Sequence, residues 1–149
     1  MRIMVSACLL GTNCKYTGGN NAHAKVLALA RDPANEIIPV CPEVMGGLPT
    51  PRPPAEVQPG GRVVTQDGRD VTREYRAGAE HCLALARKYQ PDRIILQSRS
   101  PSCGVRERYD GTFTHTRVPG QGVTAALLVQ NGFSVEDVQD IGPEGCSDR

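Results

Sequence analysis

The side chains most able to do chemistry in this sequence are three thiols, those of Cys8, Cys41 and Cys103. Each follows a short apolar segment with the composition of a β-strand, directly or within a few residues. Each also lies close to a glycine or a proline, and such residues allow the backbone to approach a cofactor. Thiolates bind iron–sulfur clusters, zinc or copper(I). If the fold brings the three thiols together, we expect a cofactor site; the alternative is that they are small buried core residues.

The remaining cysteines carry weaker signals. The sequence has no Cys-x-x-Cys pair, which disfavours an ordinary zinc knuckle. Cys14 is a fourth ligand, a redox partner or a bystander on this evidence. Cys82 lies on the apolar face of a predicted helix and reads as a core residue, and Cys146 as an incidental thiol of the tail.

Polar residues beside two of the thiols have the types needed for acid–base chemistry. Glu43 lies two residues after Cys41 and can act as a general base if it is partly desolvated; otherwise it is a solvated loop acid. Ser100 and Ser102 precede Cys103 and can hydrogen-bond a cluster sulfide, a water or a substrate. Their alternative role is turn formation, which Ser-Pro favours by itself.

Three further residues are candidate substrate contacts. Lys15 and Tyr16 lie in the Gly- and Asn-rich loop after Cys8, and Arg52 lies among prolines. The turn at residues 120–122 can present backbone N–H groups to an anion, but it lacks the glycine pattern of a dinucleotide site and a Walker lysine.

The elements that must position these side chains follow from hydrophobic periodicity. Predicted strands cover residues 2–7, 36–40, 62–65, 93–97 and 133–138. Predicted helices run from a cap at Asn20 or Asn21 to about residue 32, from Asp70 or Thr72 to about Tyr89, and over residues 123–130. The Pro- and Gly-rich stretch 41–61 is predicted to be a long loop, a kind of segment that is usually functional in a small domain.

This order of elements predicts a single three-layer α/β domain over residues 1–149, with a mainly parallel, Rossmann-like sheet. We expect a loose tail from residue 139 onward. Open parallel sheets bind their ligands outside the carboxyl ends of the strands. Because the three thiols follow three predicted strands, we expect Cys8, Cys41 and Cys103 to meet at one edge of the sheet.

Composition excludes several classes of function. The chain has 149 residues, a net charge of +1 and only 4% aromatic residues, which argues against a dedicated DNA- or RNA-binding protein. No apolar run approaches the ~18 residues of a membrane helix, and the segment before Cys8 is too short for a signal peptide. We therefore expect a cytoplasmic protein whose cysteines are thiols or ligands rather than disulfides.

Six segments together resemble a known family. They are VSACLLG at 5–11, CPE at 41–43, GGLPTPR at 46–52, SPSCG at 100–104, YDGTF at 109–113 and GQGVTAALL at 120–128. In this order they resemble the bacterial family that includes thiouracil desulfidase, over nearly the whole chain to about residue 138. The resemblance implies a [4Fe-4S] cluster held by three cysteines only, with one open iron that binds the substrate's sulfur.

The resemblance also implies roles for individual residues. Carried over by motif, the cluster ligands are Cys8, Cys41 and Cys103, the catalytic carboxylate is Glu43, and the catalytic serine is Ser100 with Ser102 as the alternate. The implied reaction is a non-redox desulfuration of a thiolated pyrimidine, a thiouracil-type base or nucleoside, with release of hydrosulfide.

Two departures from the family pattern bear on the substrate and on the ligands. Relatives read Arg-Tyr-Asp-Gly where this chain reads Lys-Tyr-Thr-Gly at 15–18, so a guanidinium fork and a carboxylate are missing. Cys14 is not a fixed part of the motif, which favours its reading as a bystander. Alternatives are a sulfur-transfer module with an acceptor partner, or a metal-binding or redox-sensing domain with four thiolates. A thiolated RNA substrate is less favoured than a free base or nucleoside, because the chain is almost neutral.

Overall fold

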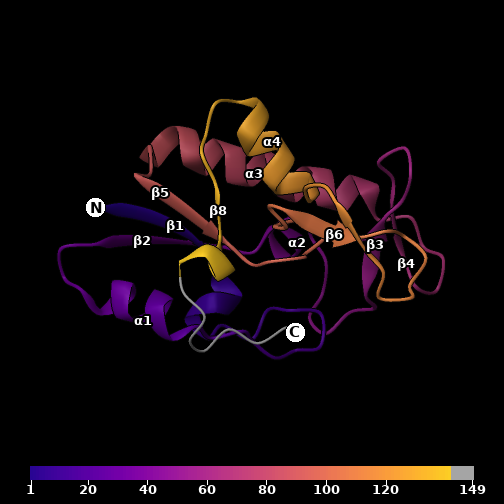
Figure 1. Ribbon diagram of the computed structural model, residues 1–149, viewed down its shortest axis with the longest axis horizontal. Coiled ribbons are helices and arrows are strands. Elements are labelled where there is room, and N and C mark those ends of the chain that lie inside the picture. The colour runs from indigo at the N-terminus through magenta and orange to yellow at the C-terminus, as the bar shows by residue number, and fades with distance from the viewer. Residues whose placement is uncertain (142–149) are drawn as a thin grey trace.

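The structure is a computed structural model that describes residues 1–141, and its centre is a four-stranded parallel sheet (Figure 1). The strands are β1 (Arg2–Ser6), β2 (Glu36–Val40), β5 (Arg93–Leu96) and β8 (Glu136–Asp137), in the spatial order β2-β1-β5-β8. β1 pairs with both β2 and β5, so Met4 lies opposite Ile38 on one side and Ile94 on the other. The prediction of a parallel α/β sheet is confirmed.

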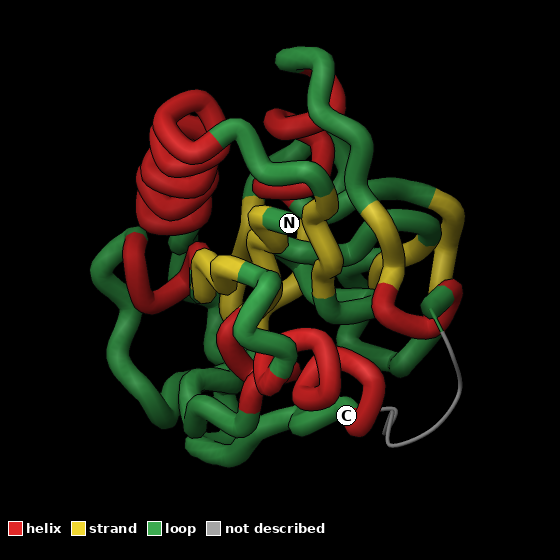
Figure 2. Tube along the Cα trace, turned by 90° about the vertical axis from the view of Figure 1, so that its left-hand side faces the viewer, coloured by secondary structure: helices red, strands yellow, loops and turns green. Residues whose placement is uncertain are grey.

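Helices cover both faces of the sheet, which gives the three layers that the sequence predicts (Figure 1). Helix α1 (Ala24–Arg31) lies on one face, and α3 (Thr72–Tyr89) and α4 (Val123–Gln130) lie on the other. Figure 2 shows helices on both sides of the strands after a 90° turn. Side chains alternate along β5: Ile95 packs with the α1 layer, whereas Ile94 and Leu96 pack with α3 and α4.

The stretch 41–61, predicted as one long loop, contains regular structure, and this prediction is wrong in part. A short helix, α2 (Pro42–Met45), begins directly after Cys41, because proline is favoured in the first turn of a helix. Strand β3 (Ala55–Val57) pairs antiparallel with β4 (Val63–Thr65), and the turn between them uses glycines at positive φ. The density of prolines concealed both elements.

Two glycines allow α2 and α3 to touch through their backbones. A Cβ built on Gly46 would lie 1.9 Å from the carbonyl oxygen of Glu74, and one on Gly78 would lie 1.8 Å from that of Pro42. Any side chain at either position would push the helices apart. This contact fixes α2, and with it Glu43, against the long helix.

The cap of α1 differs from the prediction. The Nδ1 atom of His23, not a side chain of Asn20 or Asn21, accepts the backbone N–H of Lys25 at 3.2 Å. Asn21 is buried instead, and its side chain reaches Cys8. The predicted cap is therefore wrong because the amide is used by the loop around the thiols.

The last part of the described chain contains a second hairpin and a short turn of helix. Strand β6 (Glu107–Tyr109) pairs with β7 (Arg117–Pro119), and η2 (Val138–Asp140) follows β8 directly. The segment predicted to be loose begins within η2, and residues 142–149, which include Cys146, lie outside the described residues. No helix within residues 1–141 is both long and apolar enough to cross a membrane.

Candidate active site

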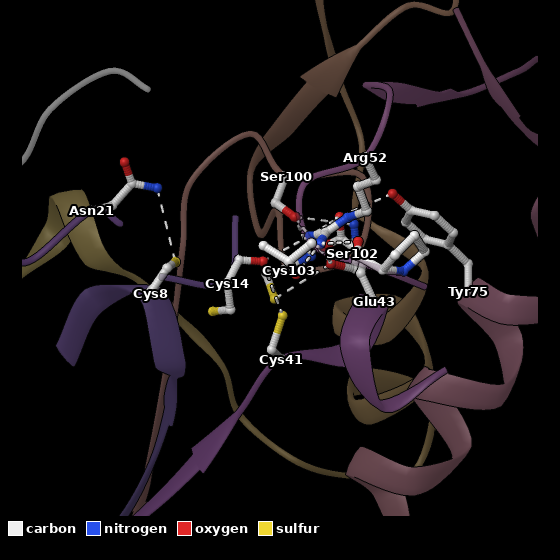
Figure 3. A network of polar contacts seen from close by, with 12 residues as sticks. Cys8, Cys14, Asn21, Cys41, Glu43, Arg52, Tyr75, Ser100, Ser102 and Cys103 are labelled. Carbon is white, nitrogen blue, oxygen red and sulfur yellow. Dashed lines mark hydrogen bonds and ion pairs between the residues drawn. The ribbon is translucent and has the colours of Figure 1, made fainter. Parts of the chain in front are cut away.

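The carboxyl ends of β1, β2 and β5 open into one cavity, and four cysteines line it. Cys8 follows β1 in the 3-10 helix η1 (Ala7–Leu10), Cys41 follows β2, and Cys103 lies on the segment after β5. The fourth is Cys14, from the loop after η1. The topology thus brings together the three thiols singled out in the sequence and adds Cys14 to them (Figure 3).

The thiols of Cys8, Cys41 and Cys103 each have a polar neighbour. The amide of Asn21 donates to Cys8 Sγ at 3.8 Å, and the hydroxyl of Ser102 lies 3.6 Å from Cys103 Sγ. The thiol of Cys41 donates to the backbone oxygen of Cys14 at 3.7 Å.

These surroundings raise the pKa values of Cys14, Cys41 and Cys103, so these three thiols are protonated near neutral pH. The hydrogen bond with Cys14 and then burial raise the pKa of Cys41 far above its usual value. For Cys14 the bond with Cys41 lowers the pKa, but the bond with Cys8 and burial together outweigh it and raise the pKa to about 11. Burial raises the pKa of Cys103. A metal group that binds these sulfurs as thiolates must therefore displace their protons.

Glu43, on α2, is held by three side chains from three other segments. The hydroxyl of Tyr75 on α3 donates to Oε1 at 3.0 Å, and Nη2 of Arg52 donates to the same oxygen at 3.2 Å. Ser102 Oγ donates to Oε2 at 2.7 Å. The side chain of Glu43 is 14% exposed. It is therefore a fixed, largely buried carboxylate at the cavity and not a solvated loop acid.

The two serines form a directed chain of hydrogen bonds. Ser100 Oγ accepts the backbone N–H groups of Ser102, at 3.2 Å, and Cys103, at 3.1 Å. Its own proton is then available for Ser102 Oγ, 3.0 Å away. Ser102 passes its proton toward Glu43. In this structure Ser102 contacts the carboxylate and Ser100 supports Ser102.

The three candidate substrate contacts all line the cavity, and Arg52 is held there by several hydrogen bonds. The guanidinium of Arg52 is 5% exposed and also donates to the backbone oxygens of Cys14, at 2.9 Å, and Pro49, at 3.1 Å. It fastens the loop around Cys14 to Glu43. Lys15 donates to Asn21 Oδ1 at 3.1 Å, and both Lys15 and Tyr16 line the cavity.

Sequence reasoning missed several residues that line this cavity, and Tyr75, Gln97 and Ser98 are three of them. Tyr75 has the helical spacing of an apolar-face residue and is buried, but its hydroxyl needs a polar partner and finds Glu43. Gln97 and Ser98 follow β5 directly, and polar residues at the end of a buried strand are the signal that could have found them.

The residues present fit an iron–sulfur cluster better than a single metal ion. Four soft sulfur donors line the cavity, and thiolates are the ligands such clusters use. Within residues 1–141, no three His, Cys, Asp or Glu side chains lie close enough together to hold one ion. Arg52 Nε and Ser98 Oγ are buried without a hydrogen-bond partner in the described part of the chain, so both remain available to an acceptor such as a sulfide.

Comparisons with known proteins agree with this reading of the site. The model of a family described as 2-thiouracil desulfurase matches residues 3–140. The chain is 41% identical over 142 residues to YbbK of Bacillus subtilis (strain 168), a protein described as uncharacterized, and the match covers 89% of this chain and 93% of YbbK. It is also 41% identical to the solved [4Fe-4S]-dependent thiouracil desulfidase TudS, with a TM-score of 0.87 over 94% of this chain and 92% of TudS.

Proposed function

The chain belongs to the 2-thiouracil desulfurase family, and we propose on that premise that it replaces the sulfur of a thiouracil-type pyrimidine with oxygen from water. The thiocarbonyl and one water give the oxo base and hydrogen sulfide, with no net transfer of electrons. The observation that carries this proposal is the convergence of the strand-end thiols and the fixed carboxylate of Glu43 on one cavity.

We propose Cys8, Cys41 and Cys103 as the ligands of a [4Fe-4S] cluster with one iron open, and Cys14 as a neighbour that is not a ligand. The support is that Cys8, Cys41 and Cys103 follow three parallel strands, at the edge where open sheets bind small molecules and cofactors. When bound, such a cluster supplies a thiophilic Lewis acid that polarises the thiocarbonyl bond.

The protein's own groups perform the proton chemistry. Glu43 takes a proton from the water that attacks the ring carbon, since it is the carboxylate fixed at the cavity. Ser102 orients that carboxylate through Oε2, and Ser100 orients Ser102. Tyr75 and Arg52 hold Oε1, so the carboxylate keeps one rotamer as the water adds.

The substrate that fits this proposal is a free thiolated base or nucleoside. The near-neutral charge of the chain gives no support for binding a polyanion such as RNA. We place the reaction in the cytoplasm, because reducing compartments keep cysteines as thiols.

The first experiment is a measurement of iron and acid-labile sulfide per chain after purification and reconstitution without oxygen. About four of each is the expected result, followed by hydrosulfide release from 4-thiouracil or 2-thiouracil. Glu43→Ala should retain the iron and lose turnover, whereas Cys8→Ala should lose both. Activity in an iron-free Cys8→Ala protein would overturn the proposal.

The position of Cys14 raises one specific alternative, a site saturated by four thiolates, which would leave no open position for a substrate. Cys14→Ala separates the two ligand sets. Three-cysteine ligation predicts unchanged iron content and turnover in this variant. Loss of iron would favour the four-thiolate, non-catalytic site.

A further inference from the structure

A buried amide oxygen in the cavity wall has no hydrogen-bond partner. Gln97 is 6% exposed and lines the cavity, and its Oε1 atom receives no hydrogen bond from the described residues. A buried acceptor without a donor is costly in a folded protein. Such an atom at a ligand cavity is expected to meet its donor in the ligand.

The position of Gln97 at the end of β5 places this side chain on the same side of the sheet as two of the thiols. Side chains alternate along β5, so Gln97 is in step with Ile95, which packs in the same core cluster as Cys8 and Cys14. The backbone N–H of Gln97 donates to Ser6 Oγ at 3.0 Å, which fixes the end of β5 against the end of β1. The amide therefore lies in the cavity wall, on the side of the sheet that carries Cys8 and Cys14.

Two other acceptors in this part of the cavity, the Glu43 carboxylate and the backbone oxygen of Cys14, are already engaged. Both carboxylate oxygens of Glu43 receive hydrogen bonds, and the backbone oxygen of Cys14 receives two. A ligand that presents an N–H group to this part of the cavity thus finds Gln97 Oε1 as a neutral, vacant acceptor.

We propose that Gln97 Oε1 accepts a hydrogen bond from the ring N–H beside the thiocarbonyl carbon, and so selects pyrimidines that carry this N–H. The inference rests on the proposed function and deepens it. In both 2-thiouracil and 4-thiouracil an N–H group adjoins the carbon that bears sulfur. When the substrate's sulfur points toward the cysteines of the cavity, that N–H is the hydrogen-bond donor nearest to the sulfur. Gln97 is thus a specificity residue that binds the substrate and takes no part in proton transfer.

The test compares 4-thiouracil with 3-methyl-4-thiouracil, in which a methyl group replaces this N–H. Dissociation constants are measured by calorimetry on cluster-loaded protein in which Glu43→Ala prevents turnover, with and without Gln97→Ala. We expect Gln97→Ala to weaken the binding of 4-thiouracil by about tenfold, the effect of one lost hydrogen bond. The same variant should bind the methylated base more tightly, because the smaller side chain leaves room for the methyl group.

A second variant guards against a folding defect. Gln97→Met removes the acceptor but keeps most of the side-chain volume. It should weaken the binding of 4-thiouracil to a similar degree and should not strengthen the binding of the methylated base. Gln130→Met, at the exposed end of α4, is the matched control and should leave both constants unchanged. Iron content and circular dichroism report whether each variant is folded and loaded.

The outcomes separate the two proposals. In one outcome the wild type binds and desulfurises 4-thiouracil, but both Gln97 variants change the dissociation constants of the two ligands by the same factor. The proposed role of Gln97 is then wrong and the proposed function stands. If the cluster-loaded wild type neither binds nor desulfurises 4-thiouracil, both the proposed function and the proposed role of Gln97 are wrong.

Discussion

The hydroxyl of Ser102 donates to Glu43 Oε2 at 2.7 Å, although the two residues lie 59 positions apart in the chain. Glu43 comes from α2, directly after β2, and Ser102 from the turn after β5. The contact joins two strand ends across β1, which lies between them in the sheet. Because Ser102 uses its proton on Glu43, Ser100 Oγ is the donor to Ser102 Oγ, and the pair Ser102–Glu43 is the end of a three-membered chain of hydrogen bonds.

Removal of the Ser102 hydroxyl should slow the reaction and spare the cluster. Ser102→Ala leaves Oε2 of Glu43 without its donor. We expect kcat to fall about 10- to 100-fold with little change in KM, less than the roughly 10²- to 10⁴-fold typical of the acid–base group itself, because Ser102 acts through Glu43. Ser100→Ala should have a smaller effect, because it acts through Ser102. Iron content, measured with kcat, should stay at the wild-type level. Ser134→Ala, at an exposed position, is the control. A larger loss in Ser100→Ala than in Ser102→Ala would assign the main role to Ser100.

Tyr75→Phe removes the donor to Glu43 Oε1 and leaves the ring in place. Arg52 still holds the same oxygen, so we expect a loss of about tenfold in kcat, the effect of one hydrogen bond to a charged group. Burial, followed by the negative charge of Glu43, raises the pKa of Tyr75 well above its usual value. The phenol therefore remains a donor at all working pH values, and the ratio of wild-type to variant kcat should be constant from pH 6 to about pH 9. A ratio that collapses toward one at the alkaline end would contradict this assignment.

The sheet and the position of the thiols were predictable because both rest on local patterns. The apolar segments before Cys8 and Cys41 have strand composition, and a parallel sheet brings strand ends together by topology alone. The partners of Glu43 were not predictable. Tyr75 has the helical spacing of a core residue, and nothing local in the sequence says that its hydroxyl meets a carboxylate 32 positions away.

The loop around residues 41–61 illustrates the same limit. Pro42 and Gly46 read as breakers of structure, yet Pro42 begins α2 and Gly46 permits the close approach of α3. The role of Arg52 was also open, since an arginine among prolines suits a substrate contact. Its burial against Glu43 and the loop at Cys14 is a tertiary fact that no spacing in the sequence encodes.

The start of α3 should show a pH-dependent contribution to stability. Hydrogen bonds from the hydroxyl and backbone N–H of Thr72, and from Arg62, hold the pKa of Asp70 well below its usual value. A carboxyl group whose pKa is lowered by folding stabilises the protein at pH values above the pKa that the group has in the unfolded chain, about 3.9. This contribution disappears as the pH falls further, toward the pKa of the folded state. Asp70→Asn should therefore be less stable than the wild type at pH 5–7, with a gap that narrows below about pH 4. Urea unfolding at several pH values measures the gap; one that is independent of pH would contradict the prediction.

The contact between α2 and α3 links stability to the placement of Glu43, and Gly78→Ala tests the link. In an open helix this change should stabilise the protein by about 1 kcal/mol, because alanine is the better helix former. Here the new Cβ would lie 1.8 Å from the carbonyl oxygen of Pro42. We expect overpacking to dominate, with a loss of about 1–3 kcal/mol in the free energy of unfolding. Since Pro42 adjoins Glu43, the displaced helix should also weaken the contact between Glu43 and Tyr75.

Urea unfolding, kcat and iron content together check the consequence of this displacement. Gly78→Ala should be less stable and slower, yet retain its iron, because Cys41 precedes α2 and follows a strand that the change does not touch. Gly19→Ala is the matched control: its new Cβ would be 3.5 Å from its nearest neighbours, an ordinary contact, and its φ is not in the left-handed region. If Gly78→Ala unfolds at a lower urea concentration but keeps full kcat, α2 can shift without moving the carboxylate. The packing of the two helices would then serve stability alone.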